Sequence, residues 1–283
     1  MTDGPVRDEK DIALFESHED IALFERHGDQ FVPTLFTTGP WRPDAMNGGA
    51  PSALIGTVIT EMVDEGEHVA GIQIDLERPV PLEPLRVVVE RRPQSRRISR
   101  LNVEVHAATG RVVAAKVLLL RGEPVGIVPS EEVPPPGPDE LAPMSWVGQG
   151  EGDSPTFHVD AIEQRFVEGG FQVLGPAVAW LRLRGTTVAG EASTALAQLL
   201  AVADFGSALS WAVLPGSGVG LINVDVNVSL FRSPVGPWFC LNSTGYAGEE
   251  GIGLAVTRLR DLRGPLGMIS QSQISHRLPG SAA

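Results

Sequence analysis

Cysteine is almost absent from this sequence, which has one in 283 residues, Cys240. A lone thiol cannot close an internal disulfide and lacks the paired spacing of a zinc or redox site, so we predict a passive strand residue. No uncharged apolar stretch of about 18 residues occurs, so no membrane-spanning helix is predicted. The first residues, Met-Thr-Asp-Gly-Pro, are polar and acidic, unlike a signal peptide. We therefore expect a cytoplasmic protein.

Positive charge is also scarce. The chain has 22 Lys and Arg residues against 35 Asp and Glu residues, and its formal net charge is −13. Such a chain has no global field that attracts phosphodiester backbones or anionic lipid. Nucleic acids and membrane surfaces are therefore not expected as partners.

The sequence lacks the motifs of several familiar catalysts. It has no Gly-rich phosphate loop, no nucleophile elbow, no His-Glu-x-x-His and no paired cysteine motif. Its histidines have no metal-binding spacing; they stand at positions 18, 27, 68, 106, 158 and 276. We predict no metal site and no resident cofactor.

What is present is typical of a folded protein with two domains. Hydrophobic residues make up 42% and charged residues 20%, and the length fits two domains of roughly 100 to 150 residues. Between Glu123 and Pro155 the apolar periodicity stops and prolines accompany acidic residues, as in a stiff linker. We predict an N-terminal extension over residues 1–30, a first module over 31–125, a Pro-rich linker over 126–155 and a second module over 156–283.

Two internal repeats are visible. A tandem nonapeptide begins at Asp11 and returns at Asp20, and we interpret it as a local duplication of which one copy is dispensable. A larger repeat relates the modules, because Arg78 and Arg232 stand in similar segments 154 positions apart (232 − 78). Gly110 and Gly264, each in a turn beside an arginine, have the same offset. This favours a gene duplication.

Each module shows one helical pattern followed by a meander of strands. Apolar residues recur at three-to-four spacing from Ser52 to Val63, with Asn47 as the predicted cap, and again from Leu196 toward Trp211. Alternating and β-branched runs then predict antiparallel strands near residues 71–77, 85–91, 101–107, 112–120, 221–230, 238–246, 252–259 and 266–275. A helix laid across such a sheet covers its apolar face. The predicted fold is α+β, a double hotdog in which each module wraps a helix with an antiparallel sheet.

Asp204 is the acidic residue in an otherwise small and apolar run from Leu199 to Trp211. At about 100° per residue it falls at the edge of the buried stripe. A carboxylate there is costly unless it is partnered or has a raised pKa, so the position is a candidate for function. A structural carboxylate that binds a strand or loop donor explains it equally well.

Several short motifs resemble a known family over about residues 31 to 280. Those in the second module resemble the second hotdog of acyl-CoA thioesterase II proteins: Ala203-Asp204-Phe205, Leu221 to Asp225 leading to Phe231-Arg232-Ser-Pro234, and Ile269-Ser-Gln271-Ser272. Those in the first module are similar to thioesterase-like proteins of actinobacteria: Gly39-Pro-Trp41, Asn47-Gly-Gly49 and Arg78-Pro-Val-Pro81.

The resemblance implies a site that holds the attacking water between an aspartate, a threonine-type residue and a glutamine. Asp204 matches the aspartate and Gln271 the glutamine, whereas Asn223 stands at the threonine position and departs from the family pattern. Asp204 is then the expected general base, and the two amides orient the water. The turn Asn47-Gly48-Gly49 is expected either to bind substrate through its backbone N–H groups or only to cap the helix.

The expected function is hydrolysis of an acyl-CoA or another acyl thioester. The alternative is a non-catalytic acyl-CoA or acyl-ligand binding protein, since a fold does not decide function. Hydratase chemistry would need an Asp/His pair near a helix, and we find none. An arginine-rich hairpin either binds the phosphates of coenzyme A or is simply solvated; its members are Arg91, Arg92, Arg96, Arg97 and Arg100. By the same resemblance, exposed strand edges predict an internal pseudo-dimer that pairs again as a homo-oligomer.

Overall fold

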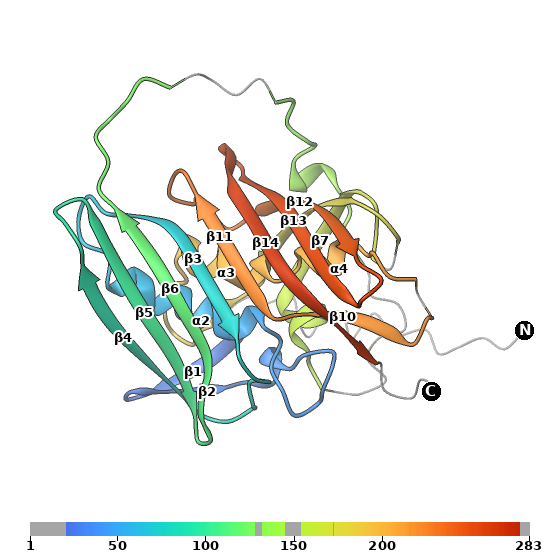
Figure 1. The fold of residues 1–283 in the computed structure, drawn as a ribbon, viewed down its shortest axis with the longest axis horizontal. Helices are drawn as coiled ribbons and strands as arrows, with labels where there is room; N and C mark the ends of the chain where they lie inside the picture. Colours follow the sequence, from blue (N-terminus) through green and yellow to red (C-terminus); the bar gives the residue numbers. More distant parts are fainter. Residues whose placement is uncertain (1–20, 128–131, 145–153, 172, 215, 278–283) are drawn as a thin grey trace, which may run out of the picture.

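The computed structural model describes residues 21–127, 132–144, 154–171, 173–214 and 216–277 (Figure 1). The first module contains one long helix and six strands, namely β1 (Ala22–His27), β2 (Gln30–Pro33), α2 (Gly49–Glu61), β3 (His68–Leu76), β4 (Leu85–Pro93), β5 (Ile98–Ala107) and β6 (Gly110–Leu120). The second module contains β7 (Ile162–Glu168), β8 (Ala177–Leu183), β9 (Thr186–Val188), α3 (Ala195–Ala203), α4 (Gly206–Leu209), β10 (Val219–Asn223), β11 (Asp225–Leu230), β12 (Phe239–Ala247), β13 (Ile252–Asp261) and β14 (Gly264–Arg277).

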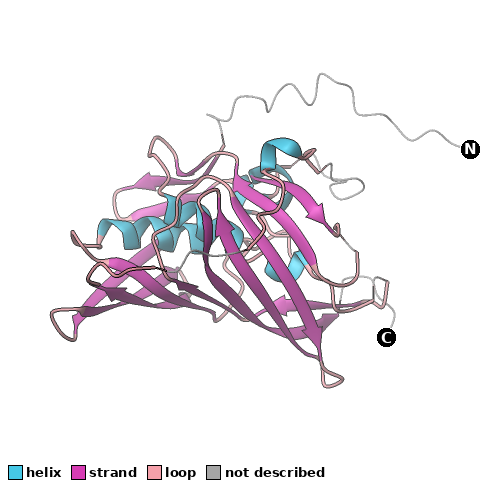
Figure 2. Ribbon diagram, turned by 90° about the horizontal axis from the view of Figure 1, so that it is seen from above, coloured by secondary structure: helices cyan, strands magenta, loops and turns pink. Residues whose placement is uncertain are grey.

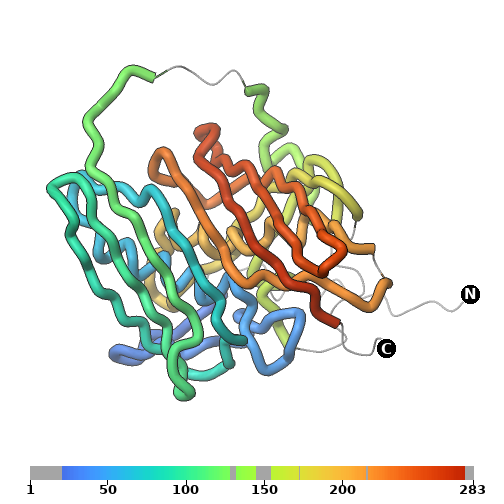
Figure 3. Tube along the Cα trace, viewed as in Figure 1, coloured from blue at the N-terminus to red at the C-terminus, as the bar shows by residue number. Residues whose placement is uncertain are grey.

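All fourteen described strands belong to one sheet. The first module runs in the order β1-β2-β4-β5-β6-β3, and the second mirrors it as β11-β14-β13-β12-β8-β7. The halves join through β3 and β11, which pair antiparallel from Gly71 opposite Ser229 to Asp75 opposite Asp225. Figure 2 shows the helices on the concave side of the curved sheet, and Figure 3 shows the two halves side by side. The predicted double hotdog is confirmed.

The duplication is visible at the level of single residues. β12 and β13 cover the residues of β4 and β5 shifted by 154 positions, and Gly110 and Gly264 open β6 and β14 with φ of 107° and 118°. Arg78 Nη2 donates to the carbonyl of Arg111 at 2.6 Å, and Arg232 Nε donates to that of Pro265 at 3.0 Å. Since Pro265 stands 154 positions after Arg111, each arginine donates to the carbonyl of the equivalent residue in its own module.

The helices do not follow the offset. α3 begins at Ala195, 146 positions after the start of α2 at Gly49, because the connection after α3, which contains α4, is longer than the connection after α2. The predicted continuous helix from Leu196 to Trp211 is therefore wrong. Its first part is α3, which ends at Ala203, and α4 follows as a separate short helix.

The second copy of the nonapeptide belongs to the first module and not to an extension. Ala22–His27 forms β1, which pairs antiparallel with β2 and parallel with β9. Leu23 and Phe24 are fully buried. The boundary expected at residue 30 is corrected for this reason, while the first copy, residues 11–18, lies outside the described residues.

The two helices pack antiparallel inside one continuous core. A Cβ added to Gly56 of α2 would lie 2.7 Å from the Cα of Ala197 in α3, so the helices cross in close contact there. Thr60 Oγ1 lies 3.2 Å from Thr194 Oγ1 at one end of the pair, and Gly49 lies against the carbonyl of Ala201 at the other. This arrangement places the amino end of α2 beside the carboxyl end of α3. No helix in the described part of the chain is long and apolar enough to cross a membrane.

The paired arginines give a matched test of the fold. Arg232 donates to Asp261 at 2.6 and 2.7 Å, and Asp261 is 1% exposed. Burial alone would raise the pKa of Asp261, but Arg232 and the N–H groups of Val235 and Arg263 outweigh it and hold that pKa below its usual value. At the position equivalent to Asp261 the first module has Ala107, and Arg78 forms no ion pair with a described residue.

We expect Arg232→Ala to lower the free energy of unfolding by about 3 to 5 kcal/mol, because it leaves a buried carboxylate unpaired. Arg78→Ala should cost about 1 kcal/mol or less, the contribution of an ordinary hydrogen bond. Urea denaturation at neutral pH measures both. Because the pKa of Asp261 is lowered in the folded state, the contribution of the pair should be present at neutral pH and lost as the pH falls through that pKa. Equal effects of the two substitutions would contradict this account.

The N-terminal strand gives a second test. We expect Phe24→Ala to lower the free energy of unfolding by about 3 to 5 kcal/mol, because a fully buried aromatic ring is lost from the core. A truncation that removes residues 1–19 keeps β1 whole and should leave the melting temperature nearly unchanged. A large decrease on truncation would mean that the removed residues contribute to the packed structure.

Candidate active site

Three side chains from distant parts of the sequence meet at the end of α3. Asp204 follows the last residue of α3, Asn223 ends β10 and Gln271 lies on β14. Asn223 Nδ2 donates to Asp204 Oδ1 at 2.7 Å and to the Asp204 carbonyl at 3.1 Å. Gln271 Nε2 donates to the same carbonyl at 2.9 Å. The three residues singled out in the sequence are therefore brought together.

The end of α3 depends on these contacts. The Asp204 carbonyl accepts from both amides, so it has partners outside the helix. Gln271 Oε1 accepts from the Ser207 N–H at 3.1 Å and so anchors the start of α4 to the sheet. A Cβ at Gly206 would lie 2.5 Å from both Gln271 Oε1 and Thr257 Oγ1. The chain can pass this close to the sheet only because residue 206 is glycine.

The first module contributes the amino end of α2. A Cβ at Gly48 would lie 2.8 Å from Asp204 Oδ2 and 3.2 Å from Leu76 Cδ1, so the absence of a side chain lets this backbone reach the carboxylate. The N-cap of α2 is Gly48 and not the predicted Asn47. Asn47 lies one residue earlier, where its Oδ1 accepts from the Gly49 N–H at 2.9 Å and its carbonyl accepts from Ala50. The Gly48 N–H donates to none of the described residues.

One buried acceptor at this site has no partner. Asn223 Oδ1 is inaccessible to solvent and accepts no hydrogen bond from any described residue, although the Nδ2 of the same amide is well placed on Asp204. An unpaired buried acceptor costs about 1 to 3 kcal/mol. Native proteins usually fill such a position with an ordered water or a ligand. The amide oxygen therefore keeps an unused acceptor position next to the carboxylate.

Burial is the main influence on the acidity of Asp204. The residue keeps part of its surface open to solvent, but the protein surrounds its carboxyl and raises the pKa above the ordinary value, while hydrogen bonds from Asn223 and Gln271 oppose the shift. The amino end of α2 also favours negative charge at this point. A carboxylate with a raised pKa binds a proton more tightly than an ordinary one, which suits a group that has to accept a proton.

Apolar walls complete the site, and the sequence gave little sign of them. Phe157 is fully buried against Gly49 and lies 6.1 Å from Phe205, between ring centroids. Leu76 closes the side next to Gly48. Phe157 stands at the very start of the second module, ahead of β7, where no periodicity marked it. Phe205 adjoins Asp204 and could have been noted from that adjacency.

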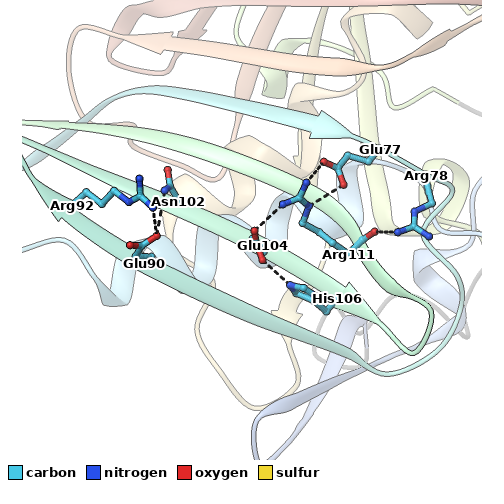
Figure 4. Close-up of polar contacts among 8 residues, drawn as sticks. All are labelled: Glu77, Arg78, Glu90, Arg92, Asn102, Glu104, His106 and Arg111. Carbon is cyan, nitrogen blue, oxygen red and sulfur yellow. Dashed lines mark hydrogen bonds and ion pairs between the residues drawn. The ribbon is translucent and has the colours of Figure 1, made fainter.

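The arginine-rich hairpin lies away from Asp204, and its arginines are largely paired with other groups of the protein. Arg91 contacts Glu67 at 2.7 Å and the carbonyl of Met62, at the opposite end of α2 from Gly48. Arg92 pairs with Glu90 on the strands shown in Figure 4. The interpretation that these side chains are simply surface groups is favoured over phosphate binding at this site.

Cys240 has the passive role predicted for it. It is 1% exposed and packs with Trp180 and Trp238. Burial raises the pKa of its thiol to about 12, so it stays protonated and is a poor nucleophile.

Two family models match the chain, one in each module. The model of the acyl-CoA thioesterase N-terminal domain matches residues 37–122, and that of the acyl-CoA thioesterase C-terminal domain matches residues 138–274. No curated protein sequence matches the chain.

Solved structures share the fold. A proposed thioesterase from Novosphingobium aromaticivorans is 23% identical with a TM-score of 0.65, covering 89% of this chain and 98% of its own. A TesB protein from Mycobacterium avium subspecies paratuberculosis is 16% identical with a TM-score of 0.60, covering 95% and 99%. A protein with a hot dog fold from Alicyclobacillus acidocaldarius is 12% identical with a TM-score of 0.66, covering 94% and 99%.

The fold and the two family models together define a double hotdog enzyme of thioester hydrolysis. The two domain models account for both modules, and the chain belongs to the acyl-CoA thioesterase family.

The acidity of Asp204 can be measured directly. We expect a carboxyl pKa above the ordinary value near 3.8, and a further rise in Asn223→Leu because a hydrogen bond that favours the charged form is lost. Carboxyl ¹³C NMR titration measures both.

Since the folded-state pKa is raised, ionised Asp204 lowers stability as the pH rises through that pKa. Asp204→Asn should therefore be at least as stable as the parent at pH 7, and this advantage should disappear below about pH 3.8, where Asp is protonated in both states. A folded-state pKa at or below the ordinary value would contradict the assignment.

Proposed function

We propose that Asp204 is the general base that activates water for hydrolysis of an acyl-CoA thioester. The observation that carries this proposal is the unpartnered Asn223 Oδ1 beside the Asp204 carboxylate. A water molecule there would donate one hydrogen to the amide oxygen and one to the carboxylate. Both acceptors are already fixed, because the Asn223 amide is anchored by its two bonds to Asp204.

The residues present can perform each step of the reaction. Asp204 takes a proton from the water as its oxygen bonds to the thioester carbonyl carbon. The carbonyl oxygen becomes negative, and the Gly48 N–H at the amino end of α2 is the available donor to it, since Gly49 and Ala50 donate to Asn47. The carbon–sulfur bond then breaks. The proton held by Asp204 passes to the departing thiolate, and the products are a carboxylic acid and coenzyme A.

Asparagine at position 223 is compatible with this chemistry. A threonine hydroxyl would offer one donor and two acceptor positions on a single oxygen. The Asn223 amide instead donates from Nδ2 and accepts at Oδ1. Its Nδ2 holds the base, and its Oδ1 is left for the water. The departure from the family pattern therefore replaces one hydrogen-bonding group by another and keeps the acceptor that a water needs.

We expect Asp204→Asn to reduce thioesterase activity by about 10²- to 10⁴-fold, because the amide cannot accept the proton. Asn223→Thr should keep or raise the activity, since it supplies the hydroxyl of the family pattern. Thiol release from acyl-CoA substrates of graded chain length measures both. For the parent, activity should fall as the pH decreases through the raised pKa of Asp204, where the base becomes protonated. Circular dichroism of each variant establishes that folding is intact.

Two outcomes decide against the catalytic assignment. One is hydrolysis by Asp204→Asn at the rate of the parent, and the other is the absence of thiol release by the parent from every acyl-CoA. The first outcome would mean that another group activates the water. The second would favour the alternative function, a non-catalytic acyl-CoA binding protein.

A further inference from the structure

Gln273 is a buried amide whose hydrogen-bonding groups are not used within the described structure. It lies on β14 two residues after Gln271 and is 5% exposed, yet neither atom of its amide bonds to a described residue. The side chain is held in place by its surroundings, while its amide is left unbonded by the described residues. Such a group is available to a ligand as both donor and acceptor.

Its position ties it to the site. Gln273 is directly opposite Asn223 of β10, and cross-strand partners point to the same face of a sheet. Alternate residues of a strand also share a face, so Gln273 lies on the same side as Gln271. On β13 it is opposite Gly253, where an added Cβ would lie 3.0 Å from Gln273 Oε1 and 2.7 Å from Leu221 Cδ1. The glycine leaves the space in which this amide lies.

The exposure of β14 shows which side of the site Gln273 occupies. Gln271 is 0% exposed and Gln273 is 5% exposed, whereas Ser275 and Arg277, the next two residues on the same face, are exposed. Gln273 is therefore on the solvent side of Asp204. Coenzyme A is large and highly charged, so its arm must leave the site toward solvent while the acyl group lies inward. A ligand group beside Gln273 would belong to the thiol arm.

The spacing along the strand fits that arm. Two residues of a strand span about 6.6 Å, and the first amide of the pantetheine arm is separated from the thioester sulfur by two methylene groups. Arg277 lies on the same face a further four residues along, about 20 Å from Gln271. It is exposed and forms no hydrogen bond or ion pair with a described residue. In a chain with a net charge of −13, this guanidinium is suited to the phosphates of coenzyme A.

We propose that the inner face of the end of β14 binds the thiol arm of acyl-CoA, with Gln273 hydrogen-bonded to the first pantetheine amide and Arg277 paired with a phosphate. The proposal rests on the proposed function for the position of the thioester carbonyl. Gln273 acts here in positioning the substrate, since it does not touch the reacting atoms.

A series of thioesters with one acyl group and shortened thiol arms tests this. The substrates are acyl-CoA, acyl-pantetheine, which lacks the nucleotide phosphates, and the acyl thioester of ethanethiol, which has no amide. Gln273→Leu should raise KM about three- to tenfold for the first two, the effect of one hydrogen bond, and leave kcat/KM for the ethanethiol ester unchanged. Arg277→Gln should raise KM for acyl-CoA alone, and less so at high salt. Gln73→Leu, the same change at an exposed glutamine of β3, is the matched control and should change nothing.

Binding measurements keep this test separate from the test of catalysis. Calorimetric titration with free coenzyme A requires no hydrolysis, and Gln273→Leu should weaken binding by the same factor. Gly253→Ala, which crowds the amide without removing it, should act in the same direction and serves if Gln273→Leu does not fold. An equal rise in KM for all three thioesters would overturn the inference. So would unchanged binding of coenzyme A in both variants. If the parent releases no thiol but Gln273→Leu still weakens binding of coenzyme A, the proposed function fails and the inference stands.

Discussion

The approach of the amino end of α2 to the carboxyl end of α3 is the contact on which the site depends. It is possible because glycines at positions 48, 49 and 56 remove side chains at the points of closest approach. A larger residue at Gly56 would meet the backbone of α3, and one at Gly48 would displace the Asp204 carboxylate. The same antiparallel helix packing that buries the core thus sets the distance between Asp204 in one module and the Gly48 N–H in the other, which donates to none of the described residues.

The duplication explains why the chain has one such site and not two. At the offset of 154 positions, Asn223 and Gln271 correspond to Val69 and Val117, and both valines are buried in the core. The second site therefore lost, or never had, its polar groups and became ordinary packing. The first module keeps the amino end of its helix as its contribution, while the second supplies the carboxylate and both amides.

The site carries a cost in stability that the rest of the fold offsets. Asp204 has a raised pKa, and Asn223 Oδ1 accepts no hydrogen bond from a described residue although it is buried. Each would be less costly as an apolar residue, as the valines of the first module illustrate. The buried carboxylate of Asp261, by comparison, is paired with the guanidinium of Arg232. An unsatisfied acceptor beside a carboxylate of raised pKa is typical of a site that is completed by its substrate.

Sequence periodicity determined the larger part of the fold. The strands β3 to β6 and β11 to β14 alternate clearly, and the offset between Arg78 and Arg232 predicted their equivalence. Short strands such as β1 and β9 were not predicted, because three to six residues carry too little pattern and their pairing partners are remote in sequence. The break after α3 was missed for a related reason. The run from Leu199 to Trp211 is uniformly apolar, and what ends the helix is a pair of amides on strands that follow much later.

Of the candidate site, the sequence by itself determined the residue types and, through a resemblance, the set Asp204, Asn223 and Gln271. Only the tertiary structure decided that Gly48 from the other module faces the carboxylate, that Asn223 is left with an open acceptor, and that Gln273 stands opposite it. Side-chain chemistry is local and can be read along the chain. Distance, burial and the presence of a hydrogen-bond partner arise between segments up to 223 positions apart, such as Gly48 and Gln271 (271 − 48), and exist only once the sheet and the two helices have packed.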